Sequence, residues 1–183
     1  MQFRILHYNS LTSTNDYAKS LCAKGVQEGI VVFSDYQTRG RGRFERRWRS
    51  PKGKDLLFSI ILRPYHLKAN QIPILTQIAA RSVQGVIDQT LRIRCTIKKP
   101  NDILIQGKKV CGILVEGSTT GKQNGADYVI VGVGLNVNSE RRQLLKRATS
   151  LYEVTGRKHD RNELLKILLI AFRNSMRQLK EKV

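Results

Sequence analysis

The chain has 183 residues and contains 33 Lys and Arg against 14 Asp and Glu, a formal net charge of +19 at pH 7. We expect one domain spanning residues 1–183, because a chain of this length buries enough apolar surface to need neither a disulfide nor a structural metal. The charge favours anionic partners, namely nucleotides, nucleic acid, an anionic membrane or an acidic protein, and does not choose among them.

Cysteine and hydropathy patterns exclude several further classes. Cys22, Cys95 and Cys111 form no CxxC pair, and their odd number argues against a disulfide framework. A reducing cytoplasm is therefore the expected compartment. The three histidines are too far apart in sequence for a zinc site of the usual spacing. The start of the chain lacks a signal-peptide pattern, and no apolar run approaches the roughly 18 residues of a spanning helix, so no membrane segment is expected.

Strands are predicted mostly in the middle of the chain, with helices towards both ends and one between. Buried or alternating apolar runs predict the strands, and apolar periodicity near 3.6 residues predicts the helices. This order suggests an α+β layer fold. The predicted strands span residues 3–8, 29–36, 55–63, 94–97, 103–105, 109–116 and 129–133. The predicted helices span residues 17–24, 70–91, 149–154 and 160–181.

Helix ends and turns carry local signals. Residues 13–16 (STND) offer an N-cap to the first helix, and Gly25 suits its C-terminal end. From this stretch alone, capping is sufficient to explain Ser13 and Thr14. Asp160 with Glu163 resembles a capping box at the start of the last helix.

A basic, glycine-rich loop, residues 39–54, joins two predicted buried strands. It carries eight Lys or Arg, three glycines, Trp48, and Glu45 as its single carboxylate. Glycine allows close backbone approach to a ligand, and arginine binds carboxylate or phosphate oxygens with two parallel hydrogen bonds. We therefore expect a lid over a ligand with more than one negative charge. On composition alone, a solvated loop or a nucleic-acid patch explains it at least as well.

Familiar nucleotide motifs are not matched. Residues 132–136 (GVGLN) lack the third glycine and the following helix of the dinucleotide fingerprint. Residues 40–43 (GRGR) do not match a Walker loop. Any nucleotide site must therefore be of another kind.

Four stretches together resemble the catalytic domain of biotin–protein ligases. Each is weak alone, and their order and spacing from Ser13 to Val137 carry the resemblance. The stretches are Ser13-Thr14-Asn15, residues 37–48 (QTRGRGRFERRW), residues 98–102 (KKPND) with 109–116 (KVCGILVE), and Gly132-x-Gly134-x-Asn136-Val137. The resemblance implies a mixed β-sheet with helices packed against it.

The same resemblance implies a two-step enzyme. Biotin and ATP, with Mg²⁺ expected on the ATP phosphates, form biotinyl-5′-AMP. A lysine of a biotin carboxyl carrier protein domain, as in acetyl-CoA carboxylase, then accepts the biotin. No residue is assigned as a metal ligand.

Site residues follow from the matched motifs. Lys109, Arg41 and Arg43 are implied as the catalytic groups that neutralise the carboxylate and the phosphate. Hydroxyl and amide groups suit the donors and the acceptor of the biotin ureido ring. The implied biotin-binding residues are Ser13, Thr14, Asn15, Gln37, Gly40, Arg41, Gly42, Arg43, Lys109, Gly112 and Leu114. The implied nucleotide-binding residues are Arg43, Arg46, Trp48, Asn101, Asp102 and Asn136. Asp102 is explained equally well as a group that orients the acceptor lysine or as a structural turn residue.

Two positions depart from the family pattern. Glu45 stands where the family usually has glycine, and Lys99 where it usually has tryptophan. Either Glu45 pairs with Arg46 or Arg47 and Lys99 points outward, or the changes lower affinity or alter the nucleotide contact. We expect neither a helix-turn-helix nor the small β-barrel of many relatives, so no repressor function or specific DNA binding is expected.

Three alternatives stay open. A lipoate–protein ligase shares the fold and the acyl-adenylate chemistry, although its RRxSGGG-like segment is absent. A nucleic-acid-binding module is favoured by the charge and disfavoured by the lack of RNP-like aromatics or a zinc knuckle. A degenerate ligase that binds biotin without transferring it is kept open by Glu45 and Lys99. The sequence does not distinguish a monomer from a homodimer.

Overall fold

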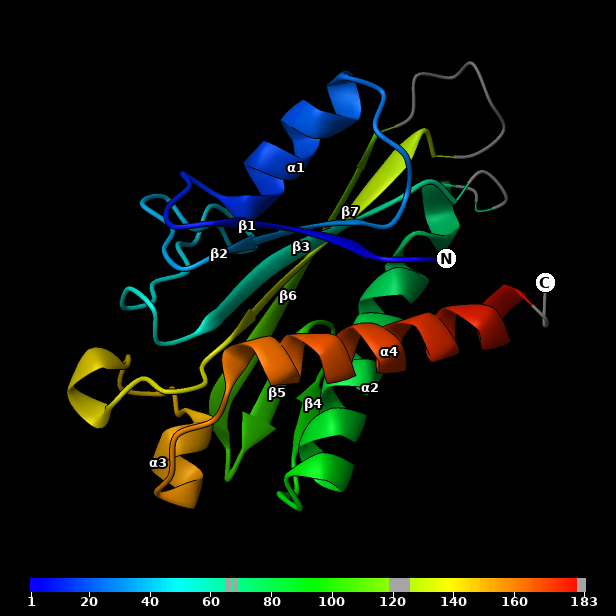
Figure 1. Ribbon diagram of the computed structural model, residues 1–183. Coiled ribbons are helices and arrows are strands. Elements are labelled where there is room, and N and C mark those ends of the chain that lie inside the picture. Colours follow the sequence, from blue (N-terminus) through cyan, green and yellow to red (C-terminus); the bar gives the residue numbers. More distant parts are fainter. Residues whose placement is uncertain (65–66, 68, 119–125, 181–183) are drawn as a thin grey trace.

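A computed structural model describes residues 1–64, 67, 69–118 and 126–180, and within them a seven-stranded mixed sheet forms the centre of the fold (Figure 1). Its strand order is β1-β2-β3-β7-β6-β5-β4. β1 pairs with β2 in parallel, and the other neighbouring strands pair antiparallel. The strands are β1 Arg4–Tyr8, β2 Ile30–Ser34, β3 Leu56–Leu62, β4 Thr96–Lys98, β5 Asp102–Ile105, β6 Lys108–Ser118 and β7 Tyr128–Leu135. The predicted mixed sheet is confirmed.

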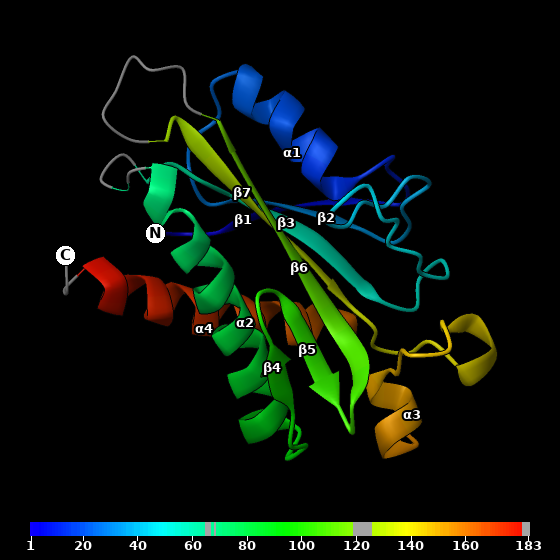
Figure 2. The ribbon, with the colours of Figure 1, turned by 180° about the vertical axis from the view of Figure 1, so that it is seen from behind.

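Helices cover both faces of this sheet. They are α1 Thr14–Ala23, α2 Pro73–Thr90, α3 Leu151–Thr155 and α4 Arg161–Lys180, with 3-10 turns η1 Ala69–Gln71 and η2 Arg141–Gln143. α1 lies on one face, while α2 and α4 pack together on the other (Figures 1 and 2). None of the helices in the described ranges has the length and apolar character needed to cross a membrane.

The strand β3 shows how one segment serves both faces. Successive side chains of a strand point to opposite faces of the sheet. Phe58 and Ile60 therefore join the core under α2 and α4, whereas Ile61 packs under α1. Every residue of this strand is buried, as the apolar run predicts.

Local signals for helix ends and turns are confirmed. Ser13 Oγ accepts a hydrogen bond from Asp16 N at 3.5 Å and caps α1. Asp160 Oδ1 accepts from Glu163 N at 3.2 Å and stabilises the start of α4. The turn between β5 and β6 places Gln106 and Gly107 at φ of 50° and 75°, a conformation that glycine adopts without strain.

Several predicted boundaries move. The helix predicted over 70–91 begins at Pro73, after a separate turn, because proline suits the first helical position, where no N–H is needed. The strand predicted over 94–97 is instead Thr96–Lys98, since Cys95 N donates to Asp88 Oδ1 on α2 at 2.9 Å. β7 continues to Leu135, two residues further than predicted, through its pairing with both neighbours. The predicted helix end at Glu181 lies outside the described residues.

All three cysteines are unpaired and buried, as expected from the absence of a disulfide pattern. Burial is the main reason that the pKa of each thiol is raised, to about 12 for Cys95. The thiolate is the nucleophilic form of cysteine, so these residues are inert packing groups.

Candidate active site

A buried polar wall stands where the N-terminus of α1 meets β3. The Thr14 amide and hydroxyl donate to Gln37 Oε1 at 2.7 and 3.1 Å. Ser59 Oγ lies 2.6 Å from Asn15 Oδ1 and 2.8 Å from Thr14 Oγ1. The structure thus brings together predicted residues that are far apart in sequence. Ser59 was missed, although it is the one polar side chain in an apolar strand.

Close packing against β7 explains one glycine of the GVGLN stretch. A Cβ at Gly132 would collide with Asn15 Oδ1. Only a residue without a side chain lets the Asn15 amide lie against the sheet. Gly132 therefore belongs to the same wall as Asn15, a role that the motif spacing alone did not reveal.

Trp48 covers the middle of the sheet beside this wall. A Cβ at Gly134 would lie 2.6 Å from Trp48 Cε2, and one at Gly112 would lie 3.0 Å from Trp48 Cζ3. Lys109 Nζ sits 5.5 Å from the centroid of the indole and 2.7 Å from Asp102 Oδ1. The indole Nε1 is buried without a hydrogen-bond partner in the described part of the chain. Trp48, Lys109 and the two glycines thus form one packed unit.

Little free space remains between the polar wall and Trp48. The pocket there has a volume of about 50 Å³, whereas sites for drug-sized ligands usually measure about 300–1,000 Å³. A small organic ligand therefore requires Trp48 and its loop to move. The pocket is lined by Ser13, Thr14, Asn15, Gln37, Arg41, Gly42, Arg43, Trp48, Asn101, Lys109, Gly112, Ile113, Leu114, Gly132, Val133 and Gly134.

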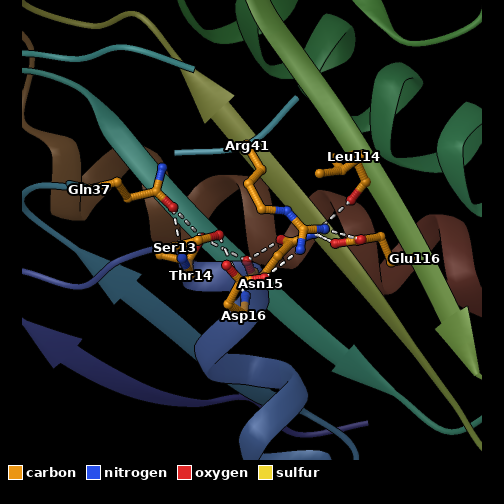
Figure 3. Close-up of polar contacts among 9 residues, drawn as sticks. Ser13, Thr14, Asn15, Asp16, Gln37, Arg41, Leu114 and Glu116 are labelled. Atoms are coloured by element: carbon orange, nitrogen blue, oxygen red, sulfur yellow. Dashed lines mark hydrogen bonds and ion pairs between the residues drawn. The ribbon is translucent and has the colours of Figure 1, made fainter. Parts of the chain in front are cut away.

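Arg41 bridges two carboxylates of the protein (Figure 3). Its Nη1 lies 2.5 Å from Asp16 Oδ1, and its Nη2 contacts Glu116 Oε1. Asn15 Nδ2 donates to Glu116 Oε2 at 2.7 Å and to Leu114 O at 3.3 Å. The loop is thereby tied to both α1 and β6. Sequence reasoning did not foresee roles for Asp16 or Glu116.

Arg43 connects the loop to the turn before β5. Its Nη1 donates to Asn101 Oδ1 at 3.3 Å, and Asn101 Nδ2 donates to Ile113 O at 2.9 Å. The guanidinium carbon lies 4.8 Å from the centroid of Phe44, whose side chain is 78% exposed. Arg43 therefore lies between Asn101, which lines the small pocket, and the solvent-exposed Phe44.

The two departures from the family pattern are both exposed. Glu45 has φ of 59° and Phe44 has φ of 53°, a left-handed conformation that favours glycine. Neither Arg46 nor Arg47 pairs with Glu45 among the ion pairs of the described residues, so the expected pairing is not found. Lys99 is exposed, as one of the two hypotheses expected.

Asp55 fixes the point where the loop rejoins the sheet. This fully buried carboxylate accepts hydrogen bonds from Ser50 Oγ at 2.6 Å, Ser139 Oγ at 2.7 Å and Val137 N at 2.9 Å. Burial raises its pKa, and these hydrogen bonds oppose that rise. The loop therefore has a rigid exit, which the sequence pattern did not predict.

The predicted nucleotide-binding residues are not all brought together. Asn136 is only 4% exposed, donates through Nδ2 to Thr149 O at 2.9 Å, and is not among the residues that line the small pocket. Arg46 is exposed and lines a larger cleft instead. Gly40 is buried, and its carbonyl accepts from Trp48 N at 2.9 Å, which closes the base of the loop.

The larger cleft adjoins the small pocket and measures about 1080 Å³. It extends from the loop to α2 and to the segment after β4. The two cavities share Arg41, Gly42, Arg43, Asn101, Ile113 and Leu114. A ligand held in the small pocket is therefore within reach of the cleft.

The described residues contain no cluster of three or more His, Cys, Asp or Glu suited to holding a metal ion.

Residues 8–136 match the biotin/lipoate A/B protein ligase family. The chain is 37% identical over 177 residues to the bifunctional ligase/repressor BirA of Bacillus subtilis, covering 94% of this chain and 54% of that protein. It is 34% identical over 174 residues to a biotin–[acetyl-CoA-carboxylase] ligase of Paracoccus denitrificans, covering 91% and 70%.

A solved structure extends the similarity to three dimensions. The biotin protein ligase from Aquifex aeolicus, in complex with biotin and ATP, matches with a TM-score of 0.84 at 34% identity. The match covers 98% of this chain and 72% of that chain. By contrast, the chain spans only about half the length of the Bacillus subtilis relative.

Proposed function

Because this chain belongs to the biotin/lipoate A/B protein ligase family, we propose that it is an ATP-dependent biotin–protein ligase. The observation that carries this proposal is the convergence of a polar wall, Lys109 and an arginine-rich loop on one small pocket. Relatives named as biotin–[acetyl-CoA-carboxylase] ligases, and the Aquifex aeolicus complex with biotin and ATP, support the choice of substrates.

The polar wall is suited to the ureido ring of biotin. Thr14 and Gln37 carry hydroxyl and amide groups that match its two N–H donors and one carbonyl acceptor. Ser59 and Gly132 hold Asn15 in place behind them. The apolar chain of biotin would then run towards Gly112 and Leu114, with its carboxylate near Lys109.

Adenylation joins two anions, so the site must supply positive charge. A biotin carboxylate oxygen attacks the α-phosphorus of ATP, forming a C(O)–O–P bond while the bond to pyrophosphate breaks. Lys109 and Arg43 border the pocket and are placed to stabilise the developing charge. Asp102 positions Lys109 through their 2.7 Å ion pair. Mg²⁺ would arrive on the ATP phosphates as part of that substrate.

The loop protects the product of this step. A mixed anhydride is easily hydrolysed, and closing a site removes water from it. Trp48 already seals the pocket against Gly112 and Gly134. We therefore assign the loop the role of a lid that opens for biotin and closes over the adenylate.

Transfer completes the reaction on a lysine of a carrier protein. The uncharged amine attacks the carbonyl carbon, a C–N bond forms, and AMP leaves with the electrons of the C–O bond. The nitrogen releases one proton to solvent. We propose the cytoplasm as the site of this reaction, supported by the three unpaired cysteines.

A direct experiment tests the proposal. The chain is incubated with biotin, Mg-ATP and the biotin carboxyl carrier domain of an acetyl-CoA carboxylase, and labelled carrier is detected. Biotin-dependent exchange of pyrophosphate into ATP reports the first step alone. We expect both signals with biotin and neither with lipoate. Exchange driven by lipoate would identify a lipoate ligase, and exchange without transfer would identify a degenerate enzyme.

A further inference from the structure

The larger cleft runs along the part of β6 that does not pair with β5. The last paired residues of β5 and β6 are Asp102 and Gly112. The next residues of β6, from Ile113 to Glu116, line the cleft. Residues of α2 form its opposite side. Its volume of about 1080 Å³ exceeds the usual range for one small molecule, which is about 300–1,000 Å³.

The rim of this cleft is strongly cationic. Its described lining includes seven Arg or Lys and three carboxylates, and two of those carboxylates, Asp16 and Glu116, already bind Arg41. Arg81 on α2 and Lys99 after β4 stand on separate elements, and both are exposed. Neither forms an ion pair with any carboxylate in the described part of the chain. Their charge is therefore available to a partner.

The floor of the cleft is apolar. Ile113 is buried there, and Ile72, Ile97 and Val115 are only partly covered by other residues. An apolar centre with a charged rim is the usual composition of a protein–protein interface. A polyphosphate alone would leave this floor without a partner.

We propose that this cleft docks the carrier protein through an acidic surface around its acceptor lysine, with Lys99 and Arg81 as the principal docking cations. The inference rests on the proposed function, because it names the surface that delivers the second substrate. Opposite charges on the two proteins would accelerate their encounter. Lys99, which departs from the family's tryptophan, thus becomes a residue that selects acidic carriers.

The same charges suit the chemistry of the acceptor lysine. Only the uncharged amine attacks the adenylate, and nearby cations disfavour an ammonium ion. Arg43 and Asn101 lie where the cleft joins the small pocket, so a lysine entering there reaches the reacting carbonyl. Acidic residues around that lysine would offset the repulsion that it meets at the rim.

Charge reversal at the rim tests the proposal. We compare Lys99→Glu, Arg81→Glu and the double variant with Lys19→Glu, which makes the same change of charge on the exposed side of α1. Each rim reversal should raise the KM for the carrier by roughly fivefold, as expected for charges that steer association. Pyrophosphate exchange and the KM for ATP should stay at wild-type values, and Lys19→Glu should change none of these.

A charge swap on the carrier tests which of its acidic residues contacts Lys99. Replacing one acidic residue beside the acceptor lysine of the carrier with lysine should restore transfer by Lys99→Glu and weaken transfer by the wild-type chain. Direct binding of the unmodified carrier, measured without ATP or biotin, should give the same ranking of variants even if transfer is slow.

Other outcomes would overturn the docking site. An unchanged carrier KM and affinity in the double variant, with normal exchange, would reject it while leaving the ligase function intact. A raised KM for ATP alone would assign the cleft to the nucleotide. Weaker binding of duplex DNA in the rim variants, with an unchanged carrier KM, would assign it to nucleic acid. Absence of biotin-dependent exchange in the wild-type chain would instead reject the proposed function.

Discussion

The polar wall and the basic loop face the same pocket and are held in place by different forces. Thr14, Asn15 and Ser59 are buried and joined by hydrogen bonds of 2.6 and 2.8 Å. Arg41 and its two carboxylates are each 38–39% exposed, and exposed ion pairs contribute little because water and salt screen them. The wall is therefore fixed before any ligand binds, whereas a charged ligand can compete for the loop and shift its position.

Lys109→Ala should have the largest effect, because it removes the cation that the Trp48 side of the pocket presents to the biotin carboxylate. We expect adenylate formation, measured as biotin-dependent pyrophosphate exchange, to fall by about 10²-fold or more. Lys108→Ala is the matched control, since Lys108 is the exposed neighbour on β6. Equal exchange in both variants would remove Lys109 from the mechanism.

Arg43→Gly should increase the release of biotinyl-5′-AMP into solution more than it slows the formation of this intermediate. Loss of the loop's contact with Asn101 opens the lid, and a hydrogen bond to a charged group is worth about 1.5–3 kcal/mol. We expect labelling of lysines on a bystander protein to rise by roughly tenfold. Arg39→Gly removes an exposed cation from the same loop and should not do this. Labelling confined to the carrier in Arg43→Gly would show that Arg43 is only a solvated charge.

Gly134→Ala tests whether the loop depends on the glycines of β7. The added Cβ would lie 2.6 Å from Trp48 Cε2, and such overpacking typically costs about 1–3 kcal/mol. We expect the Trp48 side chain to move away from its position over Gly134 and the KM for biotin to rise. Because the chain has a single tryptophan, its fluorescence emission should shift to longer wavelength. Gly85→Ala, where nothing lies within 4 Å of the new Cβ, should leave both signals unchanged.

Glu45→Gly should stabilise the fold through the loop backbone. Glycine adopts φ of 59° freely, whereas other residues lose roughly 1–2 kcal/mol in the left-handed region. We expect about 1 kcal/mol of added stability, seen as a higher urea midpoint. Glu45→Ala removes the carboxylate and keeps the strain, so it should not give this gain. An equal shift in both variants would point to charge instead of conformation.

The smallest expected effect is the pH dependence of the stability that Asp35, just before the loop, contributes. Burial alone would raise the pKa of Asp35, but hydrogen bonds from Arg161 and His7 outweigh it and lower that pKa. The stability gained from these bonds is fully present at pH values above about 3.9, the ordinary pKa of aspartate. It is lost as the pH falls through the lower pKa of the folded state. The difference in Tm between the wild type and Asp35→Asn should therefore shrink below about pH 4. A constant difference would exclude this linkage.

Local chemistry explains what the sequence by itself determined. The N-cap at Ser13, the turn at Gln106 and Gly107, and the apolar run of β3 depend on near neighbours in the chain, and the structure confirms them. The order and spacing of four motifs also predicted the mixed sheet and the family. The roles of individual site residues stay predictions: Asn136 does not line the small pocket, and Arg41 binds carboxylates of the protein itself.

Only the tertiary structure decided how the site is held. Ser59 meets Asn15 across 44 positions of sequence, and Asn15 meets Glu116 across 101. Such contacts exist only after β3, β6 and β7 have paired and α1 has packed on them, and no local pattern records that register. The same assembly brings Gly134 under Trp48 and Asp55 against Ser139. Residue types thus set the available chemistry, and sheet pairing set which of them meet.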